Sequence, residues 1–405
     1  MVATLDLDEK VGTALELRLA AHEPCYLYAD YGDGILKECK IGTTFGVHNG
    51  ILGETKQIKF YAYDVKDCPL SVFSFLNAHL KDFDLSNFNQ LTTLNLSGAG
   101  LKEIDLTQFP DIEELMLNNN RFESIDLSKS AKIRNLSITG NRLTSLNLSN
   151  LENLEVFFAA GNQLTDINLA NCSLLRQVDV NNNKLTSLDF SNCPALKQMA
   201  CNDNELTTLK VAENHILSHG NVRGNYLTFS NIPIVNSKYF YYEPQKEINA
   251  TVVEGKVDFN AESQVGGNQT TFVWKTESGI ELAEGTDYTI TDGVTTFLKP
   301  QDEKVYCEMT NATFPKLTLK TVPVEVGGSG IDGVQTNDLV YASNGVIYVN
   351  VSMDAVVTVY GVNGQVIRTL NVPEGSSEIR DLQPGIYMIS VSKQGSYYVQ
   401  KVIVE

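Results

Sequence analysis

The chain has 405 residues, of which 42% are hydrophobic, and it carries 31 basic against 49 acidic side chains for a formal net charge of −18. This length predicts more than one domain, and the acidic balance excludes nucleic acid and anionic membranes as expected partners because both attract positive fields. No apolar run in the sequence approaches the length of a membrane span. The N-terminal stretch lacks the basic and apolar regions of a signal peptide, so none is expected in it.

Residues 1–66 show alternating stretches at "LELRLA", "CYLYADYG" and "QIKFYAY", which predict β-strands. The turn in "YADYGDGIL" resembles that of PKD-like domains, and the resemblance implies a small β domain. Cys25 and Cys39 flank this turn almost symmetrically about Gly32. A cross-strand disulfide and two separate thiols are both compatible with that spacing.

A 21-residue repeat fills the middle of the chain. Each unit contains the phrase LxxLxL twice, and the second copy often reads LxxLDL. In such a phrase the last two apolar side chains are two residues apart, so both face inward from a short β-strand. An asparagine follows the first phrase in six units: Asn120, Asn141, Asn162, Asn183, Asn204 and Asn225. We expect these side chains to hydrogen-bond backbone groups at the turn and to stack as a ladder.

This pattern resembles nested leucine-rich repeats over about residues 67–233. The resemblance implies a mainly β fold, a leucine-rich-repeat solenoid with two strands per 21-residue coil and two sheets around a narrow core. The eighth unit has Gly220 and Ser230 at apolar positions, and aromatic residues follow at 239–242. We interpret these aromatics as a cap on the last coil, so that the solenoid domain spans 67–244. The alternative is a sugar-binding site.

The residues between the inward positions of the first phrase are expected to face solvent. They are predominantly polar and uncharged, apart from an apolar island in the middle of the array. An apolar anchor inside a polar surround is typical of a binding contact, and ordinary scattered surface residues are the alternative. The island and its rim form the predicted binding site: Met116, Val156, Phe158, Asn135, Ser137 and Asp179.

Two other features of the repeats are interpreted as structural. Asp84, Asp105 and Asp126 occupy one outward column of the second phrase. A calcium site is one interpretation, but the aspartate belongs to the repeat pattern and can form a local turn. Cys172 and Cys193 lie one repeat apart at a position that elsewhere holds Phe or Leu, so we expect stacked, reduced core thiols.

Residues 245–326 read as alternating strands and resemble an immunoglobulin-like β-sandwich. Trp274 is expected in its core, with Tyr306 where a tyrosine corner would fall. Cys307 has no cysteine partner on an early strand, a departure from antibody-type domains.

Residues 327–405 begin with a flexible linker, "GGSGIDG", and continue as strands with an Asn363-Gly364 hairpin turn. "NGQV", "PGIY" and the final "KVIV" resemble the C-terminal sorting domain of the type IX secretion system of Bacteroidetes. The family's usual YPNP-like start is replaced by "LVYASNG". The resemblance implies a C-terminal β-sandwich that directs secretion, and a retained anchor module is the alternative.

No catalytic set emerges from the sequence. The histidines are scattered, and no nucleophile elbow, phosphate-binding loop or zinc motif occurs. We therefore predict no enzyme, no cofactor and no metal site. The predicted function is a secreted or cell-surface binding protein for an unknown protein or glycan, with roles in interaction or adhesion. A structural spacer or stalk is the second hypothesis, and an accessory to a polysaccharide enzyme is the third.

Overall fold

The computed structural model describes residues 1–64, 69–76, 78–213, 215–326, 339–343, 346–362, 364–393 and 396–404. Cys68, the boundary at residue 66, the 327–333 linker and Asn363 of the predicted hairpin turn lie outside these residues. One compact unit comprises Met1–Ile248, Gln264–Thr271 and Met309–Lys320, and the other comprises the described parts of Asn249–Ser263, Phe272–Glu308 and Thr321–Glu405. Segments of the predicted 245–326 domain thus fall in both units.

The N-terminal strands form one five-stranded antiparallel sheet and an extension of the solenoid. The sheet has the order β4 (Leu36–Ile41), β3 (Cys25–Asp30), β6 (Gln57–Tyr61), β1 (Ala3–Leu7) and β8 (Leu80–Asp84). The extension consists of β5 (Gly46–Ile51) and β2 (Ala14–Ala21), and β2 pairs antiparallel with β7 (Leu70–Phe75), the first strand of the first coil. These strands therefore cover the backbone edge that the first coil would otherwise expose.

The cross-strand disulfide considered for Cys25 and Cys39 does not form. Cys25 pairs with Ile41 and Leu27 pairs with Cys39 in the β3–β4 register, so the two cysteines are two positions out of step. Cys39 is a buried free thiol. Of the two possibilities left open by the sequence, the structure has separate thiols, because the strand register is centred on Asp33 rather than on Gly32.

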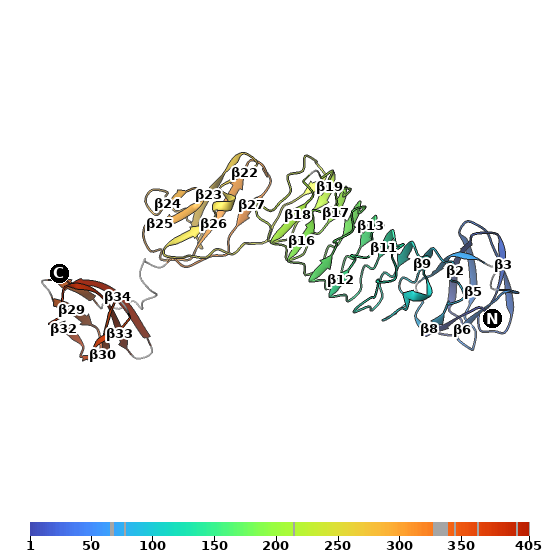
Figure 1. Ribbon diagram of the computed structural model, residues 1–405, viewed down its shortest axis with the longest axis horizontal. Helices are drawn as coiled ribbons and strands as arrows, with labels where there is room; N and C mark the ends of the chain where they lie inside the picture. Colours follow the sequence, from blue (N-terminus) through green and yellow to red (C-terminus); the bar gives the residue numbers. More distant parts are fainter. Residues whose placement is uncertain are drawn as a thin grey trace. The chain divides into compact units, whose positions relative to one another are not determined.

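The repeats form a β-solenoid whose coils stack side by side (Figure 1). The first phrases supply parallel strands: β7, β9 (Thr93–Asn95), β10 (Glu114–Met116), β11 (Asn135–Ser137), β13 (Val156–Phe158), β15 (Gln177–Asp179), β17 (Gln198–Ala200) and β19 (His219–Asn221). Each strand pairs with the next at a step of 21 residues, as Leu136 does with Phe157. The inward residues are fully buried. The predicted fold class, a mainly β solenoid of 21-residue coils, is confirmed.

The second phrases form strands in only some of the described coils. β12 (Ser145–Asn147) pairs with β14 (Asp166–Asn168), and β16 (Ser187–Phe190) pairs with β18 (Thr208–Val211). In the second coil the second phrase instead contains a 3-10 turn, η2 (Leu106–Gln108). In place of the expected second sheet, the described second phrases of the later coils therefore form two separate strand pairs.

The asparagine column forms the expected ladder inside the solenoid. Asn162 shows the pattern: its Oδ1 accepts from the Leu143 N–H at 3.1 Å, and its Nδ2 donates to the Ile138 and Ala159 carbonyls at 3.0 Å each. The same contacts recur at the other five asparagines. Gln245 extends the ladder beyond the repeats, since its side chain binds the Leu227 N–H and the Val222 carbonyl.

The last coil is capped by β20 (Phe240–Tyr241), which pairs in parallel with β19. Phe240 is buried over Gly220, where a Cβ would lie 2.5 Å from the phenyl ring. The glycine is thus required for the close approach of the cap. Tyr242 continues the apolar cover through an edge-to-face contact with Phe314, with ring centroids 5.2 Å apart. The cap interpretation of these aromatics agrees with this packing.

Residues 245–326 contain two antiparallel sheets. One sheet has the order β21 (Lys256–Asp258), β25 (Val294–Phe297) and β24 (Tyr288–Thr291). The other has the order β22 (Gln264–Val265), β23 (Asn268–Thr276), β26 (Val305–Asn311) and β27 (Thr318–Lys320). A 3-10 turn, η3 (Asn260–Glu262), lies between β21 and β22 in the chain. Trp274 is fully buried and donates its Nε1–H to Thr295 Oγ1 at 2.9 Å. Its predicted place in a core is confirmed.

The C-terminal residues form two sheets of their own. β28 (Leu339–Ser343), β29 (Val346–Val351) and β32 (Gly375–Ile379) make one, and β31 (Val366–Val372), β30 (Ala355–Gly361), β33 (Gly385–Lys393) and β34 (Ser396–Val404) make the other. Their buried side chains form one apolar cluster, which includes Val349, Val357 and Ile389. This module therefore has a hydrophobic core of its own.

Deletion of residues 327–405 should leave the thermal unfolding of the solenoid unchanged, because the deleted module has its own core. We expect the midpoint of the solenoid transition to shift by less than about 2 °C, as measured by calorimetry. A larger loss of stability would mean that the module packs on the rest of the chain.

Candidate ligand-binding face

The solvent side of the 11-stranded sheet is the candidate site, and we call it the outer face. Two columns of side chains cross it at the 21-residue step. One column contains Ser74, Asn95, Met116, Ser137, Phe158, Asp179, Ala200 and Asn221, and the other contains Val72, Thr93, Glu114, Asn135, Val156, Gln177, Gln198 and His219. The strands alternate in burial, with the central residue buried and the flanking ones turned outward.

The structure brings the predicted apolar island together in a shallow depression of about 340 Å³. Met116, Val156 and Phe158 line it with Asn135 and Ser137. Phe158 is half-buried rather than fully exposed, because its neighbours on adjacent strands cover part of the ring. The island is therefore a lining of a depression and not a set of isolated surface residues.

Hydrogen bonds hold the polar rim of this depression in place. Asn135 Nδ2 donates to Glu114 Oε1 at 3.1 Å, and Ser137 Oγ donates to Asn118 Oδ1 at 2.7 Å. Asp179 lies beside Phe158 in the strand register but lines the next depression instead. Burial raises the pKa of the Asp179 carboxyl above its usual value, and hydrogen bonds from Asn181 lower it.

A second depression of about 320 Å³ lies at the C-terminal end of the outer face. We call it the C-terminal depression, and its outward polar and aromatic side chains are Gln177, Asp179, Gln198, His219, Asn221, Tyr239 and Tyr241. The two tyrosines flank the buried Phe240 and are 45% and 41% exposed. The sequence analysis placed the aromatics at 239–242 in the cap and did not predict that two of them face outward. The alternation of side chains along a strand, with a period of two, would have indicated this.

A third depression of about 340 Å³ lies at the N-terminal end of the face, where Phe45, Val47 and Arg18 border the first coils. Here Ser74 and Thr93 are buried, although both were expected to face solvent. Met116 is shared by this depression and the central one, and Gln177 is shared by the central and C-terminal ones. The three depressions therefore follow one another without a break across the sheet.

The aspartate column of the second phrase forms turns, as the structural interpretation predicted. Asp84 and Asp105 each accept from the backbone N–H two residues on, at 3.0 Å, and from its hydroxyl at 2.6 Å. These hydrogen bonds lower the pKa of both carboxyl groups. Within the described residues, no group of three or more His, Cys, Asp or Glu side chains is arranged to hold a metal ion.

Cys172 and Cys193 are buried free thiols at equivalent positions of neighbouring coils, as expected. Burial raises the pKa of Cys172 to about 11 and that of Cys193 to about 12. Neither thiol is therefore ionised at neutral pH, and both act as small apolar core residues.

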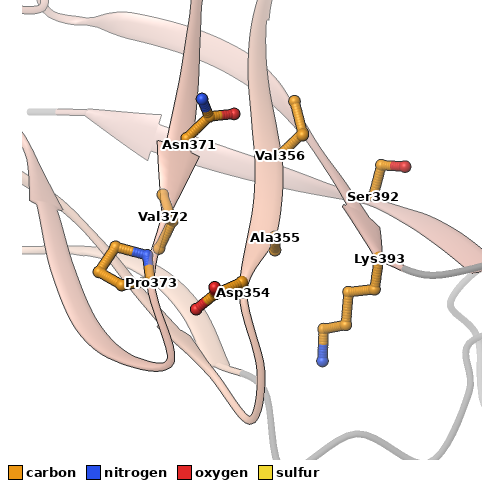
Figure 2. Close-up of a pocket in the computed structure, with 8 residues that line it drawn as sticks. All are labelled: Asp354, Ala355, Val356, Asn371, Val372, Pro373, Ser392 and Lys393. Carbon is orange, nitrogen blue, oxygen red and sulfur yellow. The ribbon is translucent and has the colours of Figure 1, made fainter.

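A separate depression of about 640 Å³ lies on the C-terminal module, across β30, β31 and β33 (Figure 2). Its polar groups already have local partners. Asp354 Oδ1 accepts from the Glu374 N–H at 2.9 Å, and Lys393 Nζ donates to Ser352 Oγ at 3.1 Å. With exposed Val356 and Asn371 as its floor, this open surface has no convergent polar groups that would orient a ligand.

Comparison with protein families identifies this module. Residues 343–405 match the family described as the secretion system C-terminal sorting domain. The chain ends in a secretion sorting domain. This match confirms the resemblance seen in "NGQV", "PGIY" and "KVIV". Because the sorting domain directs secretion, the protein is secreted or held at the outer cell surface. No helix within the described residues is long and apolar enough to cross a membrane.

Solved structures similar to the chain include leucine-rich-repeat proteins. The functional domain of InlJ from Listeria monocytogenes, whose structure includes a cysteine ladder, is 19% identical with a TM-score of 0.35, and the match covers 62% of this chain and 66% of that one. The leucine-rich effector YopM from Yersinia pestis is 22% identical with a TM-score of 0.27, covering 39% and 58%. The chain thus spans 66% and 58% of the length of these two solved chains. No curated protein matches it.

Proposed function

We propose that this protein is a secreted or cell-surface leucine-rich-repeat binding protein that mediates interaction or adhesion through the outer face of its solenoid. The observation that carries the proposal is the central depression, where Met116, Val156 and Phe158 form an apolar floor inside a polar rim. Apolar anchors in a partly desolvated pocket, ringed by polar groups, are the usual centre of a binding surface.

The way this face is built also favours binding. Its side chains stand on short strands whose backbone is fixed by the asparagine ladder and by pairing at every coil. A rigid platform lowers the entropy lost when a ligand docks. The segment at 245–326, which we propose to be an immunoglobulin-like spacer, and the sorting domain would then serve display rather than recognition.

We propose a protein or a glycan as the ligand, and binding rather than catalysis as the activity. The lining of the central depression offers amide, hydroxyl and thioether groups with a single carboxylate, Glu114, which already accepts from Asn135. Such a lining has no nucleophile paired with a general base, which acyl or glycosyl transfer would require.

Replacement of Phe158 by Ala should weaken the ligand without unfolding the protein. The full chain would be screened against arrays of purified extracellular proteins and of glycans, and each hit would be titrated with both forms. We expect at least about a fivefold loss of affinity, because the ring lines the depression while its strand neighbour Phe157 fills the core. The matched control is Tyr26→Ala, which removes an exposed ring from β3, away from the outer face.

The second candidate function is a spacer or stalk without a ligand. It predicts that the arrays give no hit. Unchanged affinity in the Phe158→Ala variant, together with unchanged stability, would exclude the central depression as the contact surface.

A further inference from the structure

We propose that the C-terminal depression is a carbohydrate subsite that takes a neutral oligosaccharide. This inference rests on the proposed function, since it names the ligand class for one end of the same outer face. The observation behind it is that Tyr239 and Tyr241 turn outward from the cap, beside side-chain amides and a carboxylate from β15 and β17. Aromatic faces pack on sugar rings, while amide and carboxylate groups bind the hydroxyls at their edges.

The two aromatic rings are held in fixed positions. Tyr239 stacks on His219, with ring centroids 4.8 Å apart and an interplanar angle of 9°. The Arg223 guanidinium lies 4.8 Å from the Tyr241 ring centroid and is itself paired with Glu243 at 3.4 Å. Rings that are already fixed lose little conformational entropy when a ligand stacks against them.

The polar groups of the depression have unused hydrogen-bonding capacity. Within the described residues, the side-chain amides of Gln177 and Gln198 make no hydrogen bond. Asp179 Oδ1 accepts from the backbone and side chain of Asn181 at 3.1 and 2.6 Å, and no described partner binds its Oδ2. Amides that both donate and accept, next to an acceptor carboxylate, match the paired hydroxyls of a sugar.

The charges favour a neutral ligand. Arg223 is paired with Glu243, and the charge of Lys238, which lies 4.9 Å from the ring centroid of Tyr239, is balanced by the carboxylate of Asp179, so these four formal charges sum to zero. The net charge of −18 on the whole chain repels an acidic polymer. An extended peptide is disfavoured too, because the backbone of β17 and β19 is already paired on both sides and the edge strand β20 has only two residues to offer for strand addition.

The size of the depression suits a short chain of sugars. From β15 to β20 there are three strand spacings, which amount to ~14 Å. The lining spans this whole width, from Asp179 to Tyr241, and adjoins the central depression at Gln177. An oligosaccharide lying across the strands would therefore contact amides and aromatic rings along its length.

The test is calorimetric titration of the full chain with linear glucose and mannose hexaoses, with a galacturonate hexaose and an extended peptide as comparison ligands. We expect a neutral hexaose to bind at or below about 1 mM. Tyr241→Ala and Gln198→Ala should each weaken it at least about fivefold. Gln198 lies on β17, outside the cap, so its variant reports on binding even if the tyrosine variant disturbs β20. Tyr26→Ala should leave the affinity unchanged.

The proposal is overturned if no neutral hexaose binds at that concentration, if binding is insensitive to both substitutions, or if only the galacturonate or the peptide binds. Phe158→Ala in the same titrations separates this inference from the proposed function. A protein ligand that is lost on Phe158→Ala, without any neutral hexaose binding, would overturn the carbohydrate subsite and leave the proposed function standing. Hexaose binding that depends on Tyr241 and Gln198 supports the subsite.

Discussion

Leu136→Ala should destabilise the solenoid by about 2–5 kcal/mol, one of the two largest effects expected of a single substitution here. Leu136 is the central residue of β11 and is 1% exposed. It pairs with Leu115 on one side and Phe157 on the other, so its loss leaves a cavity that borders two neighbouring coils. Rigid parallel strands on both sides limit how far the coil can collapse into that space.

The measurement is equilibrium urea unfolding of the full chain, with Ser137→Ala as the matched control on the same strand. Ser137 faces outward and donates one hydrogen bond to Asn118, so its variant should lose about 1 kcal/mol or less. Equal destabilisation by the two substitutions would contradict the inward and outward assignment of the whole sheet.

Asn162→Ala should be comparably damaging, at about 3 kcal/mol or more, although it removes no apolar surface. The buried amide satisfies three backbone groups, the Leu143 N–H and the carbonyls of Ile138 and Ala159. Its loss leaves the Leu143 N–H unpaired and removes one of the two asparagine hydrogen bonds that each carbonyl accepts, since Ile138 O also accepts from Asn141 and Ala159 O from Asn183. One unpaired buried N–H costs about 1–3 kcal/mol, and each of the two lost hydrogen bonds to the carbonyls costs about 1 kcal/mol more.

The control for this prediction is Asn153→Ala, because exposed Asn153 makes one hydrogen bond to the Ala131 carbonyl at 3.1 Å. Its variant should change the free energy of unfolding by about 0.5 kcal/mol. If both alanine variants unfold at the same urea concentration as the wild type, the ladder contributes little and the solenoid is held by its apolar core alone.

The central depression follows from local sequence alone, since a period of two in each strand and a step of 21 between strands determine which side chains are neighbours. That rule placed Phe158 beside Ser137 and Asp179, as the strand register has them. It holds because in-register parallel strands repeat the same contacts at every coil. Whether a ligand uses this surface is a separate matter, and the proposed titrations address it.

The sequence by itself determined the repeat, the inward leucines, the asparagine ladder and the sorting domain, because each depends on residues at a constant spacing or on a local motif. Only the tertiary structure decided how the ends are closed. Pairing of Arg18 with Ser74 joins segments that are far apart in the chain and share no period. Likewise, Gly220 interrupts the apolar repeat pattern, and only the structure shows that Phe240 packs over it. That packing places Tyr239 and Tyr241 on the outer face. Such non-local contacts depend on backbone hydrogen bonds and shape, which leave no periodic signal in the sequence.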